Sequence, residues 1–167
     1  DPVFSPEDPR LVAPGTIQLA PTGSPRVVSA EGLALRAAGV EEGGALPRLP
    51  ASRDEARAIL ALVPPAQRLE ALGLGANRAL TLGTTLGQYR IVHFATHGFV
   101  NSEYPDLSGV ALSSFDAKGQ ATDGFLRAHQ IYRLNLPVDL VVLSACQTAL
   151  GREVKGEGLI GLSRAFM

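Results

Sequence analysis

Three short runs of mostly apolar residues stand out along the chain, at residues 89–95, 107–113 and 139–145. They are rich in β-branched and aromatic side chains, which is typical of strands buried on both faces of a sheet. A helical stretch before Pro137 separates the second run from the third, and residues 156–167 have the pattern of a further helix. Strands that alternate with helices predict an α/β fold with a mostly parallel sheet.

A helical pattern also precedes the first run. Apolar side chains recur at helical spacing over residues 52–63, and two consecutive prolines then end the pattern. Ser52 and Glu55 have the spacing of a capping box, which predicts that the helix begins at Ser52. Residues 68–72 suggest a short strand, and residues 76–86 suggest a second helix weakened by glycine and threonine.

The N-terminal part of the chain has a different composition. Eight of the twelve prolines lie within residues 1–50, and proline excludes long regular elements. We therefore expect one domain, in which residues 1–44 form an irregular segment and residues 45–167 hold the regular elements. The chain starts at Asp1 and stops at Met167 within a helical pattern, so we expect a fragment truncated at both ends.

Composition narrows the class of protein. The chain has 167 residues, is 46% hydrophobic and carries a net charge of −1, as a folded domain without affinity for nucleic acid does. Its apolar runs are too short to cross a membrane, and no signal peptide is visible. The one cysteine cannot form an internal disulfide, which favours a reducing compartment and a cytoplasmic location.

Two chemically reactive side chains follow predicted strands. His97 comes after the first apolar run and Cys146 ends the third. In open parallel sheets, ligands bind beyond the carboxyl ends of the strands. A cysteine nucleophile needs a histidine nearby, and the amide of Gly98 could face a developing oxyanion. The alternative that Cys146 is a small buried apolar residue stays open at this point.

A metal site is the other use of two neighbouring histidines. On a strand, His93 and His97 would lie roughly 13 Å apart, because each residue advances by about 3.3 Å. Zinc binds histidine nitrogens at about 2 Å, so one ion could not reach both side chains. We interpret His93 as a hydrogen-bonded residue of the core and expect no metal and no cofactor.

The motifs around these residues resemble those of a known family. "HFATHG" is followed, 49 residues after His97, by Cys146 in "LVVLSACQTALG". The pair is similar to the two motifs of the CHAT domain, a bacterial relative of the caspases. "LPASRDEARAI", "LSGVALS" and "GEGLIGLSRAF" add to the likeness, so that residues 45–167 resemble the central part of that domain.

The resemblance implies a caspase-like three-layer sandwich with a mostly parallel sheet. It also implies a cysteine endopeptidase in which Cys146 is the nucleophile and His97 the general acid and base. The amides of Gly98 and Cys146 would bind the oxyanion. The substrate would be a protein or peptide. Its cleavage would serve bacterial signalling, defence or regulated cell death. Helical TPR repeats outside this chain are an expected regulatory partner, and the oligomeric state stays open.

Weaker candidates and one alternative remain. Asp106, Asp139 and Glu157 could each line a substrate pocket for a basic side chain. The glycine-rich residues 151–158 lack the Gly-Lys-Ser/Thr ending of a phosphate-binding loop. The alternative function is a non-catalytic CHAT scaffold that binds other proteins, which loss of either His97 or Cys146 would have favoured.

Overall fold

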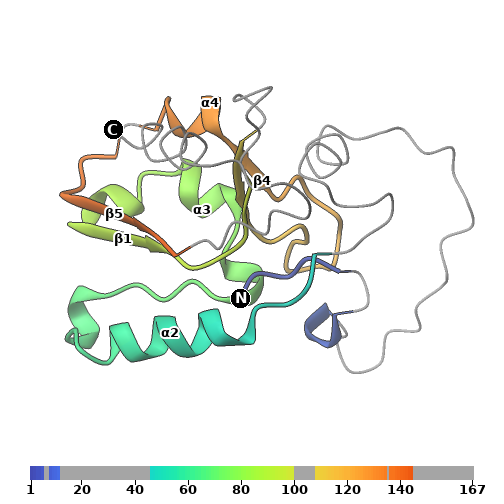
Figure 1. The fold of residues 1–167 in the computed structure, drawn as a ribbon, viewed down its shortest axis with the longest axis horizontal. Coiled ribbons are helices and arrows are strands. Elements are labelled where there is room, and N and C mark those ends of the chain that lie inside the picture. The colour runs from blue at the N-terminus through green and yellow to red at the C-terminus, as the bar shows by residue number, and fades with distance from the viewer. Residues whose placement is uncertain (6–7, 12–45, 100–107, 135, 145–167) are drawn as a thin grey trace, which may run out of the picture.

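The computed structural model of the chain describes residues 1–5, 8–11, 46–99, 108–134 and 136–144. The helix expected over residues 156–167 lies outside this part of the chain, and so do the ends of the predicted runs 107–113 and 139–145. The two sheets and the helices packed on them can be followed in Figure 1.

The described elements are short. The α-helices are α2 (Pro50–Leu60), α3 (Arg78–Leu82) and α4 (Ala128–Ile131), and single 3-10 turns cover Pro9–Leu11, Pro65–Gln67, Gly73–Gly75 and Leu86–Gln88. The strands are β1 (Ile91–Phe94), β2 (Gly98–Phe99), β3 (Gly109–Ala111), β4 (Phe125–Arg127) and β5 (Leu140–Leu143). Of the helices in the described residues, none is long and apolar enough to span a membrane.

The strands form two sheets. β1 and β5 pair in parallel, with Ile91 opposite Leu140 and Phe94 opposite Leu143. β2, β3 and β4 form an antiparallel sheet in that order. The first and third predicted runs therefore become parallel neighbours, and parallel pairing is typical of an α/β fold.

The second predicted run does not join the parallel sheet, so that part of the prediction is wrong. β3 pairs with β4 instead, and the residues between them turn back through a bridge between Phe115 and Ala121. No helix lies between β3 and β4, whereas parallel neighbours need a long crossover that is usually helical. The bridge between Phe115 and Ala121 instead folds this connection back, so that β4 returns antiparallel to β3.

Helices lie on both faces of the parallel pair. In Figure 1, α2 runs along one side of β1 and β5, and α3 lies on the other. On the first side, Glu55 of α2 comes within 3.3 Å of His93 on β1. On the second side, Leu80 packs against a core cluster that contains Val92 and Phe94. This arrangement confirms the α/β class.

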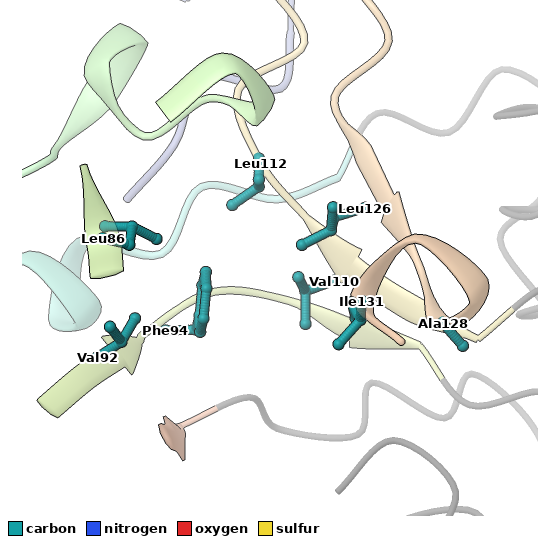
Figure 2. Packing of buried hydrophobic residues seen from close by; sticks show 8 residues of the cluster. All are labelled: Leu86, Val92, Phe94, Val110, Leu112, Leu126, Ala128 and Ile131. Carbon is teal, nitrogen blue, oxygen red and sulfur yellow. The ribbon is translucent and has the colours of Figure 1, made fainter. Parts of the chain in front are cut away.

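The main core joins the two sheets. Its members come from β1, β3, β4, α4 and the connecting turns, and their side chains converge in Figure 2. Val110 and Leu126 are 0% exposed, so these two residues hold the centre of the antiparallel sheet against β1. The buried members are Leu86, Val92, Phe94, Val110, Leu112, Leu126, Ala128 and Ile131.

Helix α2 begins earlier than its sequence predicts. Pro50 occupies the first turn, where its missing N–H costs nothing, and no side chain caps the helix. The Ser52 hydroxyl donates a hydrogen bond back to the carbonyl of Leu49 at 2.8 Å. The predicted capping box is therefore wrong, and Glu55 is directed to His93 instead.

Two further local predictions differ from the structure. Residues 68–72 form no strand. The Arg68 guanidinium donates hydrogen bonds to the carbonyls of Leu60 and Val63 near the end of α2. The helix expected over residues 76–86 shrinks to α3. The Asn77 side chain accepts a hydrogen bond from the Leu80 amide at 3.0 Å and starts this helix, as an N-cap residue does.

The assigned core predicts that shortening two different leucines changes stability by different amounts. Leu126→Ala should lower the free energy of unfolding by about 2–5 kcal/mol, because it leaves a cavity at a fully buried position. Leu62 is 84% exposed, so Leu62→Ala should change stability by less than about 0.5 kcal/mol. Urea denaturation of both variants measures the difference, and equal losses would contradict the assigned core.

Candidate active site

The carboxyl ends of β1 and β5 meet at one edge of the parallel pair. The Ser144 amide, just after β5, donates a hydrogen bond to the carbonyl of Phe94 at 2.9 Å. His97 lies three residues beyond Phe94, and Cys146 lies two residues beyond Ser144 in the sequence. These two strands are neighbours in the structure. Cys146 itself lies outside the described residues.

His97 sits where the chain passes from one sheet to the other, between β1 and β2. The residue is 2% exposed. The ring centroid of Phe4 lies 5.2 Å from that of the imidazole, and the ring of Phe99 lies 6.5 Å away. Contacts from the N-terminal segment and from β2 therefore restrict the orientation of the imidazole.

A backbone carbonyl sets the tautomer of His97. Nε2 lies 2.7 Å from the carbonyl oxygen of Pro47. A carbonyl can only accept a hydrogen bond, so Nε2 carries the proton and donates it. In the neutral ring, Nδ1 then has a free electron pair, which is the form of histidine that can take a proton from a thiol.

Burial controls the charge of this imidazole. Desolvation lowers the pKa of His97 below its usual 6.5, and the hydrogen bond to Pro47 opposes the shift without cancelling it. The ring is therefore neutral at neutral pH. A neutral imidazole with a free Nδ1 is suited to act as a general base.

The backbone of Gly98 faces away from its sheet. Gly98 is opposite Val110, and the neighbouring Ala111 amide donates a hydrogen bond to the carbonyl of His97 at 2.9 Å. Hydrogen-bonded and non-hydrogen-bonded pairs alternate in antiparallel sheets, so Gly98 and Val110 form a non-hydrogen-bonded pair. The N–H of Gly98 thus points away from β3, where it can meet an anionic oxygen.

Comparison with known proteins places the chain in a family. The model of the CHAT domain matches residues 7–167, which is most of the chain. The protein belongs to the CHAT-domain family. This family is caspase-like and related to peptidases. Neither the curated proteins nor the solved structures gave a match to this chain.

Of the three substrate-pocket candidates of this CHAT domain, only Asp139 lies in the part of the chain that the structure describes. Asp139 precedes β5, at the opposite end of the strand from Ser144, and its carboxylate accepts a hydrogen bond from Arg90 at 2.5 Å. The structure therefore does not bring Asp139 to the candidate site. Asp106 and Glu157 lie outside the described residues.

The two neighbouring histidines have separate environments. His93 faces α2, where Nε2 comes within ion-pair distance of Glu55 at 3.3 Å but not in hydrogen-bond geometry. His97 is directed to Pro47 instead. No group of three potential metal ligands occurs among the residues that the structure describes, and the two histidines do not converge.

The sequence does not predict two residues of the site, Pro47 and Phe4. Every residue has a backbone carbonyl, so the acceptor role of Pro47 leaves no signature in its side chain. Phe4 lies more than 90 positions before His97, within the segment expected to be irregular. Only the folded chain brings both residues to the imidazole.

The environment of His97 predicts that the free energy of unfolding depends on pH. The folded-state pKa lies below 6.5, so His97 contributes stability that is present above the unfolded pKa and is lost as pH falls through the folded value. An NMR titration of the imidazole should have its midpoint below 6.5. The free energy of unfolding should fall more steeply with acid than in His97→Gln. A midpoint at or above 6.5 would contradict the burial of this ring.

Proposed function

We propose that this CHAT domain is a cysteine endopeptidase with a caspase-like three-layer sandwich, in which His97 and Cys146 form the catalytic pair. The observation that carries the proposal is the parallel pairing of β1 with β5. This pairing brings the chain segments that lead to both residues to one edge of the sheet. The family match supports the same chemistry.

Chain length limits how far the two residues can separate. Two residues span at most about 7 Å, so the Cα atom of Cys146 lies within that distance of the Cα atom of Ser144. Ser144 is itself hydrogen-bonded to Phe94 at the end of β1. The short reach from Ser144 supports placing the thiol near the end of β1, the strand that precedes His97.

The proposed reaction uses the free nitrogen of His97. Nδ1 takes the proton from the Cys146 thiol as the sulfur attacks the carbonyl carbon of a peptide bond. The C–N bond then breaks, Nδ1 gives the proton to the leaving amine, and a thioester remains. Water attacks the thioester, gives a proton to His97 and releases the acid, and that proton returns to the sulfur.

The charge that develops on the peptide oxygen needs donors. The N–H of Gly98 points away from β3 and is the first, and the amide of Cys146 is proposed as the second. Fixed donors of this kind lower the barrier because they need no reorganisation as the charge appears. The hydrogen bond to Pro47 supports the same step by holding the ring that delivers the proton.

The substrate is proposed to be a protein or peptide. The chain's net charge of −1 favours no polyanion. A regulatory domain outside this chain, of the TPR or another type, is a proposed partner that would control access to the site.

One observation favours the alternative, a non-catalytic CHAT scaffold. His97 is 2% exposed and its ring packs against Phe4. A histidine that serves only to join the two sheets would have the same surroundings. The scaffold and the peptidase differ in what they predict for the reactivity of Cys146.

Alkylation of Cys146 by iodoacetamide, measured against pH, separates the two functions. We expect labelling at pH 6.5 to be at least about tenfold slower in His97→Ala than in the unmodified chain, because the base that activates the thiol is lost. His93→Ala is the matched control, since this histidine faces α2 rather than the strand ends, and it should label at the normal rate.

An ordinary thiol would give a different profile. Labelling that follows a pKa near 8.5, and that is the same with and without His97, would mean an unactivated cysteine. That result would reject the peptidase and favour the scaffold.

A further inference from the structure

The carboxylate of Asp1 is buried among three arginines. Its side chain is 0% exposed, and its Oδ2 lies 2.9 Å from Nη2 of Arg48, 3.0 Å from Nε of Arg53 and 3.2 Å from Nη1 of Arg10. One negative charge thus holds three guanidinium groups close together. Without it, these groups would repel one another.

Two of these arginines follow closely after Pro47, whose carbonyl orients His97. Arg48 directly follows Pro47, whose carbonyl accepts the hydrogen bond from the imidazole. Arg53 lies in the first half of α2, which begins at Pro50. Asp1 therefore fixes the chain on both sides of the turn that enters the helix, and with it the position of the Pro47 carbonyl.

Asp1 is itself held by the body of the domain. Its carbonyl accepts hydrogen bonds from the Gly73 amide at 3.2 Å and from the Arg10 guanidinium at 2.8 Å. The carbonyl of Val3 accepts another from the Ser114 amide at 2.9 Å. The backbone that carries the Asp1 carboxylate is therefore held in place by these hydrogen bonds.

The same segment touches the imidazole directly. Phe4, three residues after Asp1, lies with its ring 5.2 Å from that of His97. Residues 1–5 thus reach His97 by two routes, one through a ring contact and one through Arg48 and Pro47.

We propose that Asp1 is a positioning residue for His97, which acts through Arg48 to hold the Pro47 carbonyl against Nε2. The importance of Asp1 for peptide cleavage rests on the proposed function. The effect of Asp1 on the imidazole of His97 does not, and the effects on cleavage and on the imidazole can be measured separately. The side chain of Arg48 is 45% exposed, so water replaces the Asp1 carboxylate as its partner once the charge is removed.

Asp1→Asn in the full chain tests this role, since it keeps the shape and removes the charge. The first readout is solvent exchange of the His97 Nε2 proton, followed by NMR. We expect exchange to become at least about tenfold faster, because the hydrogen bond to Pro47 opens more often. The second readout is alkylation of Cys146 at pH 6.5, which should slow by about tenfold as the ring loses its alignment.

Asp123→Asn is the matched control. This carboxylate also pairs with more than one arginine, since its Oδ2 lies 2.7 Å from Nη1 of Arg78 and 3.0 Å from Nη1 of Arg127. Its loss also removes a paired charge, but neither arginine is among the three that surround Asp1. Proton exchange at His97 should stay within about twofold of normal in this variant.

Arg48→Gln keeps the test decisive if Asp1→Asn does not fold, because the exposed arginine is replaced with little loss of packing. It should accelerate exchange as Asp1→Asn does, and the double variant should add nothing further. Normal exchange in Arg48→Gln, or equal acceleration in Asp123→Asn, would overturn the proposal. Alkylation that is independent of His97 in the unmodified chain would instead reject the peptidase and leave the exchange result to stand alone.

Discussion

The parallel pairing of β1 with β5 is the constraint on which the candidate site depends. Parallel strands end at the same edge of a sheet, so whatever follows Phe94 and Leu143 must begin side by side. Antiparallel pairing of the same strands would have sent the histidine and cysteine segments to opposite ends. The core cluster on one face and α2 on the other hold this pair in place.

The surroundings of His97 combine two requirements that oppose each other. Burial lowers the pKa of the ring and keeps it neutral, which a general base needs, but it also excludes water from the polar Nε2. The Pro47 carbonyl resolves the conflict because it satisfies Nε2 and leaves Nδ1 free. The cost is that the ring depends on segments far away in the sequence, including the buried charge of Asp1.

The sequence predicts the parts of this structure that local pattern controls. The apolar runs around His93 and Val141 correctly indicate strands of a parallel sheet, and His97 follows the first of them as expected. Pattern alone does not distinguish a strand of the parallel sheet from β3, because both are short apolar runs. The absence of a crossover helix between β3 and β4 makes the difference. Contacts such as those of Pro47 and Asp1 join residues about 50 positions apart, and no local pattern encodes them.

The central claim is that His97 and Cys146 meet across the edge of the β1–β5 pair. A crystal structure of the domain with both residues in view tests it most directly, through the distance between Nδ1 of His97 and the sulfur of Cys146. The account predicts a separation of about 4 Å or less, with no side chain between them, allowing for the looser contacts of an unliganded site. Packed side chains between the two atoms would contradict it and make this CHAT domain a scaffold.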